Sequence, residues 1–258
     1  ISYKIKMKFI KEFKSQGYSI VNFSKLEKTK LLKIKKKLLS KLKNKYNIKE
    51  KKFCENFHNY INIKNLNEIR FNLYNQINKK SFNIEYYKLC SNFIEPLIGT
   101  ENVIQKKINL SIQLPNDDSS LLPVHSDTWA GDCPFEIVIW IPLVNCKKTQ
   151  SMFILPRNSK KFEMFNKKLF KLDRGIINYI KKDIKFINIK FGQALIFSQN
   201  LPHGNFINKE KKTRWSMNAR VKSLMSPYSS KGLLDFFDII KILPVTELGL
   251  EYEYPKFK

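Results

Sequence analysis

The sequence lacks several features that would place it in a class at once. No apolar run approaches the roughly 18 residues of a membrane-spanning helix. The N-terminal stretch "ISYKIKMKFIKEF" has neither an apolar core nor a small-residue cleavage site, so we expect no secretory signal and a cytoplasmic location. Cysteine is scarce and shows no CxxC spacing, which is typical of free thiols in a reducing compartment. The four are Cys54, Cys90, Cys133 and Cys146.

Acidic residues are also scarce, with 22 Asp and Glu against 48 Lys and Arg and a formal net charge of +26. Such a balance is found in proteins that bind nucleic acids or anionic membranes. Here lysine supplies nearly all of the positive charge, is spread along the chain and accompanies abundant Asn and Ile, as AT-rich codon usage favours. The densest basic run, "LLKIKKKLLSKLKNKYNIKEKK", is more typical of a solvated helix face. We therefore expect no nucleic-acid partner, while an acidic or phosphorylated substrate and an anionic membrane surface stay open.

Helical patterns dominate the first hundred residues. An amphipathic helix is expected to stop at Gly17, a strand to span 18–23, and Ser24 to cap a long helix that reaches about Tyr46. Two further helices are expected, one over "NEIRFNLYNQINKK" and one over "IEYYKLCSNFIEPLIG", which ends near Gly99.

Short strand patterns follow. They are "VIQKKINLSIQLP", "PFEIVIWIPLV", "SMFILP", "FINIKFGQALIFSQNLPHGN" and "KTRWSMNARVKSL". Helices followed by many short strands predict an α+β fold with a β-barrel or double-sheet core. We expect one domain over 1–258, with helical support at 1–100, the core at 101–225 including a partly helical insertion at 158–185, and a tail at 226–258 that holds one helix-like segment.

A histidine and a carboxylate stand two residues apart at the start of the strand-rich half. If the segment is extended, His125 and Asp127 point to the same side. They would then form two thirds of a facial metal triad, and His203 is the natural third ligand. Two imidazoles and one carboxylate with open positions suit non-haem Fe(II).

The strand "TRWSMNARV" alternates strictly. Its polar residues, Arg214, Ser216, Asn218 and Arg220, fall on one face. The polar face could meet water, or it could line an interior cavity while helices cover the apolar face. Buried arginines are costly unless anions meet them. A ligand carboxylate held by Arg214, with Ser216 as a further donor, would satisfy that need.

Together, His125-x-Asp127, His203 and Arg214-x-Ser216 resemble the Fe(II)/2-oxoglutarate-dependent oxygenases, in their phytanoyl-CoA dioxygenase-like branch. Four segments are similar to bacterial oxygenases of carbohydrate-biosynthesis clusters, relatives of the streptomycin-pathway oxygenases. These are "HSDTWAGDCPFEIVIWIPLV", "SMFILP", "FGQALIFSQNLPHGN" and "RWSMNARVK". The resemblance covers about residues 108–225.

The resemblance implies a double-stranded β-helix, a cupin-like jelly roll, with N-terminal helices packed on its major sheet. It implies that His125, Asp127 and His203 hold Fe(II). The distal carboxylate of 2-oxoglutarate would then bind Arg214 and Ser216. Gln113 is a further candidate for a hydrogen bond to this cosubstrate.

The implied reaction uses O2, converts 2-oxoglutarate to succinate and CO2, and hydroxylates a C–H bond. In the halogenating members of the superfamily a small residue replaces the carboxylate, so Asp127 favours hydroxylation.

The expected substrate is a small polar metabolite, such as a sugar, a nucleotide-sugar or a surface-polysaccharide precursor. Candidate substrate contacts are Trp129, Asn205 and Arg220. Core packing explains Trp129 equally well, Asn205 could instead fix its loop through side-chain-to-backbone hydrogen bonds, and Arg220 could lie at the surface. Two alternatives stay open: a metal-binding cupin-like protein of the isomerase type, and a basic nucleic-acid-binding module. The sequence sets no oligomeric state.

Overall fold

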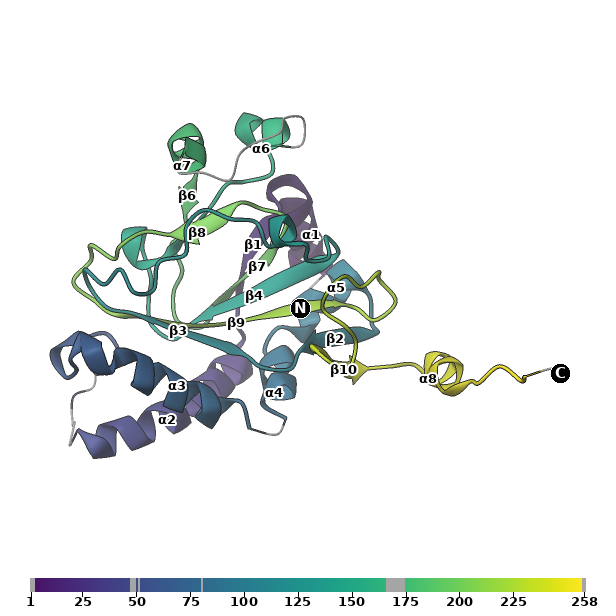
Figure 1. The fold of residues 1–258 in the computed structure, drawn as a ribbon, viewed down its shortest axis with the longest axis horizontal. Coiled ribbons are helices and arrows are strands. Elements are labelled where there is room, and N and C mark those ends of the chain that lie inside the picture. The colour runs from purple at the N-terminus through teal and green to yellow at the C-terminus, as the bar shows by residue number, and fades with distance from the viewer. Residues whose placement is uncertain (1–2, 47–49, 51, 80, 166–174, 257–258) are drawn as a thin grey trace.

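The structure is a computed structural model and describes residues 3–46, 50, 52–79, 81–165 and 175–256 (Figure 1). Its helices are α1 (Tyr3–Gln16), α2 (Lys25–Lys45), α3 (Leu66–Ile77), α4 (Phe82–Lys88), α5 (Ser91–Ile98), α6 (Lys160–Phe165), α7 (Gly175–Ile180) and α8 (Pro244–Glu251). Within these ranges no helix is both long enough and apolar enough to cross a membrane. The expected insertion at 158–185 contains α6 and α7, and its residues 166–174 lie outside the described ranges.

The strands form two antiparallel sheets. They are β1 (Tyr18–Asn22), β2 (Asn102–Gln105), β3 (Asn109–Gln113), β4 (Glu136–Pro142), β5 (Met152–Ile154), β6 (Lys185–Phe186), β7 (Gln193–Ser198), β8 (His203–Asn205), β9 (Arg214–Ser223) and β10 (Phe237–Lys241). The larger sheet has the order β1-β7-β4-β9-β2-β10, and β3 also pairs with β9. The smaller sheet has the order β6-β5-β8. The mixed helix and sheet composition agrees with the expected α+β class.

Local signals explain the N-terminal elements. The helix α1 ends at Gly17, whose φ of 78° is readily accessible only to glycine. Ser24 caps α2 and forms a capping box with Glu27, so that each side chain satisfies a backbone N–H of the other. The stop at Gly17 and the Ser24 cap were expected from the sequence, while the contribution of Glu27 was not.

Two expectations about elements were wrong. The helix predicted over "IEYYKLCSNFIEPLIG" is two helices, α4 and α5. The chain bends between them at the buried residues Leu89 and Cys90, whose amides donate to carbonyls three residues earlier. The tail also contains β10, which pairs with β2 at the edge of the larger sheet. Its sequence, "FDIIK", is too short for apolar spacing to separate strand from helix.

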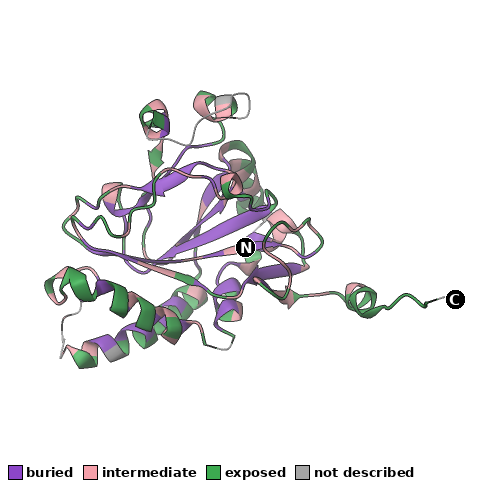
Figure 2. Ribbon diagram, in the orientation of Figure 1, coloured by how far each residue is buried: buried purple, intermediate pink, exposed green. Residues whose placement is uncertain are grey.

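Helices and loops of the N-terminal half cover the outer face of the larger sheet. The ring of Trp215 on β9 packs edge-on against Phe57 with centroids 4.9 Å apart, and its indole N–H donates to the Cys54 carbonyl. The hydroxyl of Tyr86 on α4 donates to the carbonyls of Ile139 and Met217, in β4 and β9. Figure 2 shows both strands buried along most of their length. The polar face of β9 must therefore point toward the smaller sheet.

Candidate metal centre

Backbone pairing brings two of the predicted metal ligands together. The amide of His125 donates to the His203 carbonyl at 3.0 Å, and the amide of His203 donates to the His125 carbonyl at 2.8 Å. Residues that exchange both bonds lie directly opposite each other, so their side chains share a face. The two imidazole centroids are 4.3 Å apart.

Asp127 completes the cluster. One of its carboxylate oxygens lies 3.9 Å from Nε2 of His125. One ligand atom from each of His125, Asp127 and His203 lies within 4.8 Å of the other two. The three side chains that the sequence singled out are therefore close enough to share one ion.

The imidazoles are oriented for metal binding. Nδ1 of His125 donates to the Pro123 carbonyl and Nδ1 of His203 to the Leu201 carbonyl, each at 2.8 Å. Because a carbonyl only accepts, these bonds place a proton on Nδ1, so that Nε2 is the metal-binding atom of each ring in its neutral form. Burial lowers the pKa of His203 to about 4, with a further decrease from nearby His125. At neutral pH the His203 ring is thus in the neutral form that a metal ion requires.

The segment that carries the cluster is not a continuous strand. Ser126 is extended, and Asp127 begins a 3-10 helix that runs to Ala130. The expected strand alternation therefore does not reach Trp129. Its side chain packs on Phe165, with ring centroids 5.6 Å apart, in a small apolar cluster beside α7. Trp129 does not line the cavity that contains the metal-ligand candidates.

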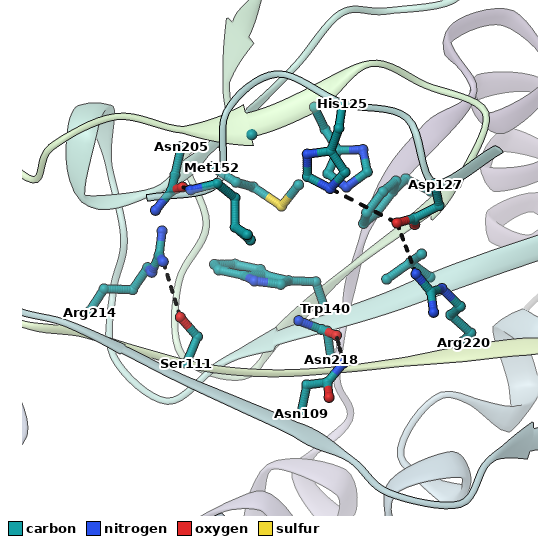
Figure 3. A pocket seen from close by; sticks show the side chains of 15 residues that line it. Asn109, Ser111, His125, Asp127, Trp140, Met152, Asn205, Arg214, Asn218 and Arg220 are labelled. Carbon is teal, nitrogen blue, oxygen red and sulfur yellow. Dashed lines mark hydrogen bonds and ion pairs between the residues drawn. The ribbon is translucent and has the colours of Figure 1, made fainter. Parts of the chain in front are cut away.

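The candidate ligands line one cavity of about 240 Å³, and Arg214 lies at the other end of it (Figure 3). Trp140 and Met152 lie between the two ends. The full lining is Asn109, Ser111, Leu122, His125, Asp127, Val138, Trp140, Met152, Phe197, His203, Gly204, Asn205, Arg214, Asn218 and Arg220. Of the two alternatives for the polar face of β9, an interior cavity is therefore the correct one.

Arg214 is a buried cation that has no anionic partner in the part of the chain that the structure describes. One of its terminal nitrogens donates to the Ser111 hydroxyl at 3.1 Å, while its Nε has no partner among the described residues. No described carboxylate forms an ion pair with it, and burial lowers its pKa to about 10. The buried hydroxyl of neighbouring Ser216 also lacks a partner among the described residues, although Ser216 is not one of the residues that line the cavity. Buried polar groups of this kind are costly unless a ligand binds them.

Arg220 is placed differently from Arg214. One terminal nitrogen lies 2.9 Å from the Asp127 carboxylate and 3.1 Å from that of Asp132. Asp132 also pairs with Lys231 at 2.5 Å. The guanidinium that we expected to contact substrate therefore holds a candidate metal ligand. Asp132 was missed, because only the folded chain brings it to Arg220.

Two other predicted residues surround the cavity in supporting positions. Gln113 pairs with Arg214 in the register of β3 and β9, but its amide donates to the Phe206 carbonyl at 2.8 Å and it does not line the cavity. Asn205 lines the cavity, yet its side chain accepts from the Leu122 amide at 2.6 Å and donates to the Ser120 carbonyl at 3.1 Å. It therefore fixes the segment that leads into His125.

Sequence reasoning also missed two lining residues of β3. Ser111 and Asn109 share a strand face with Gln113, and they stand opposite Ser216 and Asn218. Strand alternation from Gln113 would have found both.

Comparison of the sequence with protein-family models gives no match, and comparison with curated proteins gives none. Comparison of the fold with solved structures does give matches. EctD from S. alaskensis with 2-oxoglutarate and 5-hydroxyectoine matches at a TM-score of 0.56 and 16% identity, over 88% of this chain and 78% of that chain.

Two further structures have similar scores. The non-heme alpha-ketoglutarate-dependent carbocyclase SnoK from nogalamycin biosynthesis has a TM-score of 0.51 and 13% identity, over 88% of this chain and 86% of that chain. The non-heme monooxygenase ThoJ, as its nickel complex, has a TM-score of 0.51 and 12% identity, over 90% of this chain and 83% of that chain. The chain therefore has the fold of these non-heme enzymes, with a His–Asp–His cluster in its cavity.

Proposed function

We propose that this chain is an Fe(II)- and 2-oxoglutarate-dependent oxygenase that hydroxylates a small polar metabolite. One observation carries the proposal: a single cavity joins the His–Asp–His cluster to a buried guanidinium that has no anionic partner among the described residues. A ligand with a metal-binding group at one end and a carboxylate at the other could bind an ion held by the His–Asp–His cluster and pair with the guanidinium. The two facing sheets would form a jelly roll, and the chain would act as one catalytic domain in the cytoplasm.

The ligand set fits Fe(II). Two neutral imidazoles and a carboxylate that leave positions open are the usual ligands of non-haem Fe(II) oxygenases. His125, Asp127 and His203 would hold the ion, and the backbone carbonyls on their Nδ1 atoms would fix the rings. Bound iron and 2-oxoglutarate supply the activation of O2 and the oxidative decarboxylation that yields succinate and CO2.

The opposite end of the cavity fits the distal carboxylate of 2-oxoglutarate. Arg214 would pair with it through its free guanidinium N–H, and the Ser216 hydroxyl would add a second donor. Gln113, which pairs with Arg214 in the strand register, would support this end. The buried surroundings strengthen such a pair because little water competes for it.

The remaining polar lining indicates the kind of substrate. Asn109 on β3 donates to the Asn218 side chain on β9 at 2.9 Å, and both line the cavity. Amide groups donate and accept hydrogen bonds and therefore suit hydroxyl-bearing molecules. We propose a sugar, nucleotide-sugar or surface-polysaccharide precursor, in line with the narrower sequence resemblance to carbohydrate-pathway oxygenases.

Anaerobic titration with Fe(II) and 2-oxoglutarate tests the proposal. We expect the weak visible charge-transfer band of the iron chelate, and its loss in the Asp127→Ala variant. Asp118→Ala is the matched control, because Asp118 is an exposed carboxylate outside the cavity. A protein that gives no band, or an Asp127→Ala variant that retains activity, contradicts the proposal.

A cupin-like isomerase would use the His–Asp–His cluster but has no need of Arg214. Oxygen-dependent production of succinate from 2-oxoglutarate separates the two functions. The unpaired guanidinium supports the oxygenase.

A further inference from the structure

The end of the described chain projects away from the body of the molecule. After β10 the chain leaves the larger sheet and forms α8, which lies apart from the other elements (Figure 1). None of its residues is buried, and Figure 2 shows it exposed along most of its length. Residues 243–256 are called the C-terminal arm below.

The arm is strongly apolar for an exposed segment. The exposed fraction is 80% for Val245, 67% for Leu248 and 85% for Tyr254. An isolated helix of this length is marginal in water, and most helical stability in proteins comes from packing an apolar face. The arm therefore needs a surface to pack against, and the described residues of its own chain bury none of the residues of α8 and hold the arm at its start through the Leu243 amide, which donates to Glu101.

The charge of the arm indicates what kind of surface it packs against. The arm carries Glu247, Glu251 and Glu253 against a single lysine, Lys256, in a chain of net charge +26. An acidic apolar arm on a strongly basic protein is complementary to another molecule of the same protein.

The exposed side of α1 offers a matching surface. A shallow hollow there is lined by Met7, Lys8, Ile10, Lys11, Lys14 and Ser15. The exposed fraction of Ile5 is 56% and that of Met7 is 47%. Apolar side chains flanked by lysines would meet leucines flanked by glutamates.

The start of the C-terminal arm and the helix α1 both lie beside α5. Phe9 of α1 packs edge-on against Phe93 of α5, with ring centroids 5.5 Å apart. At the arm's root, Lys241 lies 3.5 Å from Glu95 of α5. A two-fold axis beside α5 would therefore let each arm cross to the other copy.

We propose that the C-terminal arm packs on α1 of a second copy, and that two copies exchange arms in a symmetric dimer. The proposal does not depend on the metal centre, so it stands or fails separately from the proposed function.

Sedimentation velocity of the full chain at about 0.15 M salt tests the proposal, because salt at this concentration screens the repulsion between two basic bodies. We expect a dimer, and a monomer for the double variant Val245→Asp, Leu248→Asp. These residues are exposed, so the fold should be unchanged. Phe71→Asp on α3 is the control, because Phe71 is 65% exposed and lies outside both surfaces. A monomeric native protein, including one whose arm folds onto its own α1, or a double variant that stays dimeric, overturns the proposal.

Charge exchange identifies the receiving surface. The pair Glu247→Lys, Glu251→Lys and the pair Lys11→Glu, Lys14→Glu should each raise the dimer dissociation constant by about tenfold, since each surface ion pair contributes little and four recur across the dimer. Combining both pairs in one chain should restore most of the native affinity. If the combination is no better than either pair alone, α1 is not the receiving surface.

Discussion

Arg214 and Arg220 lie on the same face of β9, but their surroundings differ. Arg220 meets two carboxylates, those of Asp127 and Asp132. Arg214 meets only the Ser111 hydroxyl among the described residues. The first arginine is thus neutralised within the protein, while the second retains binding capacity for a ligand.

Replacing Arg214 by Met should weaken 2-oxoglutarate binding about 10- to 100-fold, because a charge-assisted hydrogen bond contributes roughly 1.5–3 kcal/mol. Titration of the iron-chelate band measures this. The matched ligand is 2-oxobutyrate, which has the same metal-binding group without the distal carboxylate. Its affinity should change little, and an equal loss for both keto acids would show that Arg214 acts only through the fold.

Replacing Arg220 by Met should lower the affinity for Fe(II) about 10- to 100-fold, since removal of a group that orients a metal ligand has effects of this size. Calorimetric titration with the metal under anaerobic conditions measures the change. The urea midpoint should be recorded alongside, because general destabilisation would shift it. Unchanged metal affinity would mean that Arg220 does not position Asp127.

At the scale of elements, the pairing of β4 with β9 buries two further ionisable side chains outside the metal centre. Glu136 stands opposite Lys222, and both side chains are buried. Burial raises the pKa of Glu136 from 4.5 to about 7, although Arg220 and Lys222 act in the opposite direction. One carboxylate oxygen of Glu136 accepts no hydrogen bond from the described residues.

This raised pKa predicts a pH dependence of stability. Between pH 4.5 and 7 the folded chain binds more protons at Glu136 than the unfolded chain, so the free energy of unfolding should fall as pH rises, by about 3 kcal/mol. Glu136→Gln should remove this loss. Urea unfolding should give the variant and the native protein similar stabilities at pH 4.5, and a more stable variant at pH 8. A variant that is less stable at pH 8 would contradict the assignment.

Elements with strong local signals were predictable from the sequence. The capping box of Ser24 and Glu27 sets the start of α2, and the alternation of β9 separates its two faces. The strand β10 and the break at Leu89 and Cys90 were not predictable, because pairing with β2 decides the first and burial in the core accompanies the second. Propensity is too weak to override such tertiary contacts.

The candidate site follows the same division. His125, Asp127, His203 and Arg214 were selected from their spacing and from the resemblance that it carries, and the structure places all four around one cavity. Asp132 and the turn of the chain after Ser126 were not, since they depend on how a loop crosses the sheet. Arg220 was predicted as a site residue, but its ion pairs with Asp127 and Asp132 were not.

At the scale of the whole molecule, the net charge of +26 gives a prediction about polyanions. Random duplex DNA should bind weakly at about 50 mM salt, and the affinity should fall steeply by about 200 mM, because release of counterions drives such binding. Fluorescence anisotropy with a labelled duplex measures this. Tight binding that persists at the higher salt would favour the nucleic-acid-binding alternative over codon-driven composition.

The two outermost strands of the larger sheet, β1 and β10, lie near opposite ends of the described chain. They shield the backbone of β7 and β2, whose N–H and C=O groups would otherwise be free to recruit strands from other molecules. Trimming the protein at either end for expression, even far from the cavity, should therefore produce insoluble material before it affects catalysis. Shortened versions should therefore keep β1 and β10, and also α1, because its Phe9 is buried in the main core and packs on Phe93.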